Sequence, residues 1–146
     1  MKRHGRTGVL SALLAGLCLL LSVFWVAPAH ATYRLTFVEA TESPPLCVTR
    51  FAVENTSSAT LLGLNAVIQL NSASGPVGTS RGLLIGPVSP GQTLIAEASA
   101  ANLPCGQVES YTLVVEGCQT EAGSIDRVAC AAAFQALEPF TSVIAR

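Results

Sequence analysis

After Ala31 the chain contains no lysine, histidine, methionine or tryptophan, although it continues to Arg146. Without histidine or lysine, this part of the chain cannot form a Ser-His-Asp triad or a Ser-Lys dyad. It also cannot complete a mixed Cys/His zinc site, and no Cys-x-x-Cys motif is present. A single aspartate argues against a carboxylate calcium loop. The composition therefore predicts that the protein is not an enzyme and needs no cofactor or metal.

The charged side chains after Ala31 are sparse and mostly acidic. Five arginines stand against nine acidic residues, which gives a formal net charge of about −4. This balance argues against nucleic acid or anionic lipid as a partner, since both select for clustered basic residues. Glu39 with Glu42, and Glu109 with Glu116, are the carboxylate pairs available for acid–base chemistry. Their neighbours predict exposed strand faces and loops, so we expect the glutamates to be solvated.

Residues 1–31 have the pattern of a secretory signal peptide. A basic start is followed by an apolar run from Val9 to Val26, and Ala29-His30-Ala31 matches the small-residue cleavage pattern. The run is almost long enough to span a bilayer, so an uncleaved N-terminal membrane anchor is the alternative. We expect cleavage after Ala31. The mature domain, residues 32–146, is then secreted or periplasmic and has no further contact with a membrane.

Turn-forming residues divide residues 32–146 into strand-length pieces. The separators are rich in proline, glycine, serine and asparagine, which favour turns or cannot continue a strand. Short strands at this spacing predict an antiparallel β-sandwich. The predicted strands are Tyr33–Glu39, Leu46–Asn55, Leu61–Asn71, Val77–Val88, Thr93–Ser99 and Val108–Glu116, followed by a last region from Arg127.

Alternation of apolar and polar residues assigns inner faces to five of these strands. The fourth alternates poorly and is rich in glycine, which indicates an edge strand or a bulged loop. The side chains expected to face inward are Tyr33, Leu35 and Phe37; Cys47, Thr49, Phe51 and Val53; Leu62, Leu64, Ala66, Ile68 and Leu70; Leu94, Ala96 and Ala98; and Tyr111, Leu113 and Val115.

The segment 126–137 has two interpretations. We favour a strand hairpin in which residues 128–134 pair directly with the preceding strand, with Val128, Cys130, Ala132 and Phe134 inward. The alanine content supports a short helix instead, capped by Ser124 or Asp126 and ended by Pro139. In that case residues 140–145 supply the closing strand.

Four cysteines in a small exported chain imply two disulfides, and three pairings are conceivable. If strands alternate up and down, Cys47 starts one strand at the end of the sandwich where Cys105 precedes another. Cys118 and Cys130 then meet at the opposite end. Pairing Cys47 with Cys118 would have to bridge a strand length, roughly 30 Å, whereas bridged Cα atoms lie within about 7 Å. The sequence therefore predicts Cys47–Cys105 and Cys118–Cys130.

Two smaller features have structural interpretations. Tyr111 resembles the tyrosine corner of Greek-key sandwiches, in which the hydroxyl ties down a nearby loop; otherwise it belongs to the core. Asn55-Thr56-Ser57 matches a glycosylation triplet, although such triplets are common by chance.

Three runs carry a resemblance to a known class of domain: Phe51 to Ser58, Val67 to Asn71 with Gly75, and Ser89 to Thr93. The stretch from Cys47 to Ala98 resembles small exported immunoglobulin-like domains of the FxLYD and fibronectin type III kind. It departs from them at Leu70-Asn71, where Leu-Tyr-Asp is typical, and in its four cysteines. The resemblance implies an all-β, single antiparallel immunoglobulin-like β-sandwich of about seven strands in an envelope or extracellular setting. It implies no catalytic residues.

These features predict a non-catalytic module that binds another protein through loops or an exposed edge strand. The triplet Leu83-Leu84-Ile85 is the candidate contact, because poorly alternating apolar residues near an edge leave surface exposed. Burial in the core is the alternative for this triplet. A structural or assembly subunit of the cell envelope, in which the same edge self-associates, is the second functional hypothesis. A small enzyme or inhibitor is the third.

Overall fold

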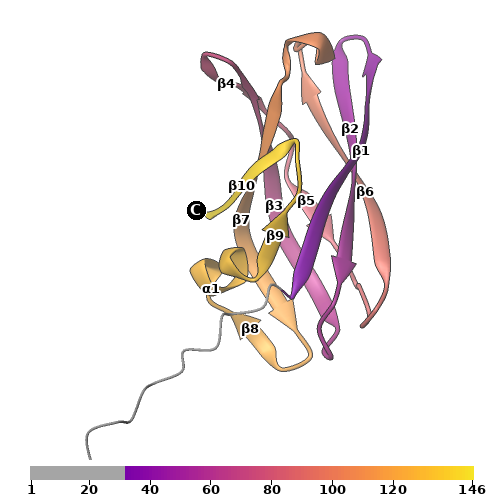
Figure 1. Ribbon diagram of the computed structural model, residues 1–146, viewed down its shortest axis with the longest axis vertical. Coiled ribbons are helices and arrows are strands. Elements are labelled where there is room, and N and C mark those ends of the chain that lie inside the picture. The colour runs from indigo at the N-terminus through magenta and orange to yellow at the C-terminus, as the bar shows by residue number, and fades with distance from the viewer. Residues whose placement is uncertain (1–31) are drawn as a thin grey trace, which may run out of the picture.

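The computed structural model describes residues 32–146, which form two packed β-sheets (Figure 1). The predicted all-β sandwich is confirmed. The predicted signal peptide, residues 1–31, lies outside the described residues. In spatial order, the first sheet contains β6 (Thr93–Ala101), β2 (Leu46–Asn55), β1 (Tyr33–Ser43) and β9 (Phe134–Ala136). The second contains β10 (Phe140–Ala145), β7 (Ser110–Thr120), β3 (Leu61–Ser72) and β4 (Gly75–Thr79); β5 (Leu83–Ile85) also pairs with β3, and β8 (Gly123–Ile125) with β7.

The core follows the predicted alternation along most strands. All four inward residues of β2, from Cys47 to Val53, are buried, as are Leu35 on β1 and Leu113 on β7. Leu62 was expected to face inward, and this is wrong: its side chain is 43% exposed, while Leu61 is fully buried. The register between β3 and β7 shifts between Leu61 and Gly63. Such an irregularity reverses the facing of every residue on one side of it.

The favoured strand hairpin over residues 128–134 is also wrong, because this segment begins as helix α1 (Arg127–Ala132). The Asp126 carboxylate accepts hydrogen bonds from the backbone N–H groups of Val128 and Ala129, at 2.9 and 3.2 Å. This N-cap, together with the high helix propensity of alanine, favours the helix over the hairpin. Residues 140–145 supply the closing strand, as the alternative predicted.

Helix α1 also changes the direction of the strands that follow it. All other strand pairs are antiparallel, but β9 runs parallel to β1 and β10 runs parallel to β7. Figure 1 shows α1 beside β8 at the end of the sandwich where β1 begins. The chain therefore re-enters the first sheet in the direction of β1 and then returns along β7.

The two disulfides are those predicted, and they lie at opposite ends of the sandwich. Cys47 at the start of β2 is bonded to Cys105 in a short 3-10 helix, η1 (Cys105–Gln107). Cys118 near the end of β7 is bonded to Cys130 in α1. The first bridge spans 58 residues of sequence and the second spans 12.

Asn55, the asparagine of the glycosylation triplet, has a fully buried side chain. Its amide nitrogen donates to the carbonyl oxygens of Ala59 and Val88, both at 2.8 Å. Its amide oxygen accepts from the N–H and the hydroxyl of Ser57. Both amide protons and the oxygen are engaged, so the side chain joins the β2–β3 and β5–β6 connections and is closed to a glycan in the folded protein.

Candidate binding cleft

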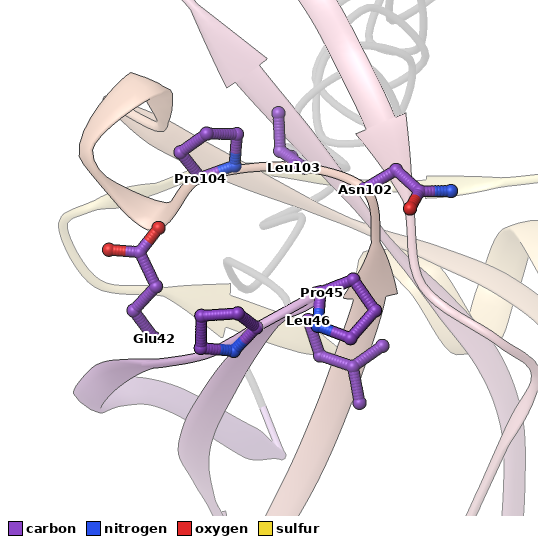
Figure 2. Close-up of a pocket in the computed structure, with 7 residues that line it drawn as sticks. Glu42, Pro45, Leu46, Asn102, Leu103 and Pro104 are labelled. Atoms are coloured by element: carbon purple, nitrogen blue, oxygen red, sulfur yellow. The ribbon is translucent and has the colours of Figure 1, made fainter.

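A cleft of about 240 Å³ lies at the end of the sandwich that contains the Cys47–Cys105 disulfide (Figure 2). Two connections form its walls: the turn between β1 and β2, and the segment that leaves β6 toward η1. Figure 2 shows Glu42 and Pro104 at one end of the cleft and Asn102 at the other. The lining residues are Glu42, Pro44, Pro45, Leu46, Asn102, Leu103 and Pro104.

Covalent and backbone contacts hold the two walls together. The backbone N–H of Asn102 donates to the carbonyl oxygen of Pro45 at 2.7 Å, which joins the two walls at one end of the cleft. The Cys47–Cys105 bridge joins the same two connections, with a Cα–Cα distance of 5.1 Å. Three of the seven lining residues are prolines, whose rings fix φ. The shape of the cleft is therefore determined before anything binds.

The lining is mainly apolar and carries one ionisable group. Leu103 is 8% exposed and packs against the core, whereas the three prolines are exposed. Glu42 is also exposed, and its carboxylate points toward the segment that contains Pro104, at one end of the cleft (Figure 2). This arrangement suits a group with an apolar body and a positively charged end.

The predicted contact triplet is divided by the structure. Ile85 is 1% exposed and belongs to the core, and Leu83 is half-buried against it. Leu84 is 77% exposed, the most exposed large apolar side chain among residues 32–146. It lines a hollow of about 280 Å³ on the second sheet, with Asn65 and Gly117. Ile85 therefore belongs to the core and Leu84 to the surface, and none of the three residues lines the cleft.

The glutamate pairs considered from sequence are separated as well. Glu39 bonds to Arg50 at 2.7 Å on the outer face of the first sheet, while Glu42 lines the cleft. The hydrogen bond that Arg50 donates to the Glu39 carboxylate raises the pKa of Arg50 above its ordinary value. Glu109 and Glu116 are exposed. Within residues 32–146, no group of three or more histidine, cysteine or acidic residues is placed to hold a metal ion, and no helix is long and apolar enough to cross a membrane.

Tyr111 is a core residue near the cleft end of the molecule. Its ring stacks on Phe37 at a centroid distance of 5.4 Å and contacts Phe140 at 5.5 Å. Tyr33 packs against Phe134 at 4.9 Å toward the other end. Burial raises the pKa of both phenols above the ordinary value. These tyrosines fill the interior, which leaves none in the cleft.

Comparison with known proteins shows a similarity of fold alone. No protein-family model and no curated protein matches this chain. A solved structure described as the structural characterization of IrmA from Escherichia coli is similar over 73% of this chain and 91% of that chain. The TM-score is 0.52 and the sequence identity is 13%, so the similarity concerns the fold alone.

Sequence reasoning missed the cleft, although the signal for it was present. Prolines flank both cysteines of the predicted Cys47–Cys105 pair, at Pro44-Pro45 and at Pro104. As residues that interrupt strands, they predict separators between strands and do not by themselves indicate a cleft. Because the predicted bridge brings both cysteines to one end, it also brings these prolines to face each other. Rigid apolar rings on two cross-linked connections indicate a preformed recess.

Proposed function

We propose that this chain is a non-catalytic binding module of an exported compartment, and that its cleft receives a segment of a partner protein. The observation that carries this proposal is the preformed cleft between two cross-linked connections. A rigid site loses little conformational entropy on binding, so a modest contact area can give a measurable affinity. Loops held on a rigid sandwich are a common location for binding sites.

The chemistry of the cleft favours an arginine or lysine side chain of the partner. Either side chain has an apolar stem that could lie against the prolines and Leu103, with a cationic head near Glu42. Arginine fits better, because its planar guanidinium packs on flat surfaces and presents several donors to one carboxylate. The acidic balance of residues 32–146 supports a cationic segment as the ligand.

The proposed setting is secreted or periplasmic. Two disulfides indicate an oxidising compartment outside the cytoplasm. The pattern of residues 1–31 supports export, with an uncleaved N-terminal anchor as the alternative form.

The test is a titration of the isotope-labelled domain, followed by NMR, with N-acetyl-arginine methylamide as the probe. N-acetyl-norleucine methylamide, which has the apolar stem without the charge, is the matched control. We expect shifts in Leu46, Asn102 and Leu103 with the arginine probe, and dissociation in the millimolar range. Norleucine should bind several-fold more weakly.

Two variants sharpen the test. Glu42→Gln should weaken arginine binding about threefold to fivefold, the upper part of the range for one exposed ion pair. Glu116→Gln removes an exposed carboxylate outside the cleft and should leave binding unchanged. Arginine shifts scattered away from the cleft, or equal binding by the Glu42→Gln variant, would contradict the proposal.

A further inference from the structure

The first sheet ends in a long strand with an open edge. β6 is nine residues long and pairs with β2 from Thr93 to Ala101 without a register shift. The other edge strand of that sheet, β9, has three residues. Among the strands described in residues 32–146, β6 is therefore the longest regular strand with one side unpaired by another strand.

Two hydrogen bonds establish which backbone groups of β6 face the open side. The carbonyl oxygen of Gln92 accepts from Asn55, so the even-numbered residues are directed toward β2. The carbonyl oxygen of Ser99 accepts from the N–H of Arg81, on the side away from β2. Because both backbone groups of a residue in an antiparallel strand point the same way, the odd-numbered residues face outward. Thr93, Ile95 and Glu97 thus present N–H and C=O groups with no backbone partner in residues 32–146.

The usual protection of an edge strand is missing from Thr93–Glu97. This stretch contains no proline and no lysine, and its pairing with β2 has no bulge. Its one charge, Glu97, bonds to Arg50 of β2 at 3.2 Å and lies on the outer face of the sheet. Ile95 is 45% exposed on the same face. The edge can therefore accept another strand.

We propose that the occupant of this edge is β6 of a second copy, paired antiparallel about a two-fold axis at Ile95. This register pairs Ile95 with its symmetry mate and Thr93 with Glu97 of the second copy. Each of the three outward residues exchanges two hydrogen bonds with its partner, so all six free donors and acceptors on each copy are used. The two four-stranded sheets become one continuous sheet.

Neighbouring registers are less favourable. A two-fold axis at Glu97 places two carboxylates directly opposite each other, which is destabilising. An axis at Leu94 opposes Glu97 to Gly91, whose N–H already donates to Asn55. An axis at Ala96 opposes Thr93 to Ser99, whose carbonyl already accepts from Arg81. The Ile95 register avoids all three conflicts.

The contact is narrow, so the dimer should be weak and reversible, with a dissociation constant on the order of 100 µM. The measurement is sedimentation velocity of residues 32–146 from about 10 µM to about 1 mM, a range that brackets this constant. Hydrogen exchange at both concentrations gives a second readout: the amides of Thr93, Ile95 and Glu97 should exchange more slowly in the concentrated sample.

Ile95→Lys and Ile95→Pro should each raise the dissociation constant at least about tenfold, the first by charge and the second by loss of the outward N–H. Neither change removes a bond within the monomer, so the far-ultraviolet spectrum and melting temperature should stay near those of the native chain. Leu84→Lys adds the same charge to the other sheet and should dimerise like the native chain. A monomer at every concentration, or a dimer that Ile95→Pro does not weaken, overturns the proposal.

Discussion

Each end of this sandwich contains one disulfide, but the two disulfides hold different structures: one lies beside a cleft and the other anchors a helix. At one end, Cys47–Cys105 joins two connections whose prolines stay exposed around a cleft. At the other, Cys118–Cys130 fastens α1 over the core, where Cys130 and Ala131 are buried. The buried amide of Asn55 lies at this second end.

The two ends show that a disulfide can either fix two surface loops on the sides of a cleft or anchor a helix that covers the core. At the cleft end the disulfide fixes the separation of two loops and leaves space between them. At the helix end it anchors an element that fills space. We therefore expect changes at the first end to affect both stability and binding, and changes at the second to affect stability alone.

Loss of the Cys47–Cys105 bridge should have the largest effect. Its removal by Cys47→Ala with Cys105→Ala should lower the free energy of unfolding by about 4 kcal/mol, because the bridge closes a long loop in the unfolded chain. Urea titration measures the loss. Binding of the arginine probe should disappear as well, even in conditions where the variant remains folded. Retained binding would show that the cleft does not depend on the bridge.

Loss of Cys118–Cys130 should cost less, about 3 kcal/mol, because the loop that it closes is shorter. The variant is Cys118→Ala with Cys130→Ala, compared by the same urea titration. The arginine probe should still bind to the folded fraction with native affinity. A loss of binding here would mean that the two ends are coupled through the sheets.

Replacement of Asn55 by alanine should destabilise the helix end by about 2 kcal/mol. The carbonyls of Ala59 and Val88 would lose their donor in a buried site. Asn65→Ala, at an exposed position of β3, is the control and should change stability by less than about 0.5 kcal/mol. Equal effects of the two variants would contradict the role assigned to the buried amide.

The smallest expected effect is a loss of stability in alkali. Each end contains one tyrosine whose pKa is raised by burial. The unfolded chain ionises its tyrosines near pH 10, before the folded chain does. The unfolded state therefore binds fewer protons above that pH, and the free energy of unfolding falls as pH rises. Tyr111→Phe and Tyr33→Phe should each reduce this slope, measured by urea titrations between pH 9 and about 11.

Much of the fold was predictable because the sequence repeats one local rule. Phe51 and Val53 lie two residues apart between the charged residues Arg50 and Glu54, which is sufficient to identify the inner face of β2. The rule failed at Leu62, where a register shift depends on how β3 meets β7. Residues 128–134 fit both the helical and the strand period, so their pattern alone does not choose between the two structures. The choice depends on the N-cap of Asp126, which forms only in the folded backbone conformation.

The parallel strands and the cleft could not be obtained from local patterns. The direction of β9 and β10 depends on where α1 delivers the chain, which is a property of the whole path. The cleft depends on two proline-containing turns that are far apart in sequence. The Cys47–Cys105 bridge joins those turns, so the prolines beside the two cysteines form the walls of one recess.

The engaged amide of Asn55 has a practical consequence for producing this protein. In a host whose secretory pathway glycosylates Asn-x-Ser triplets, the side-chain nitrogen of Asn55 can either receive a glycan or donate its hydrogen bonds to Ala59 and Val88. A chain that acquires the sugar first cannot place Asn55 between Ala59 and Val88. Bacterial export avoids the competition, so the yield of folded material should be higher there than from a glycosylating host.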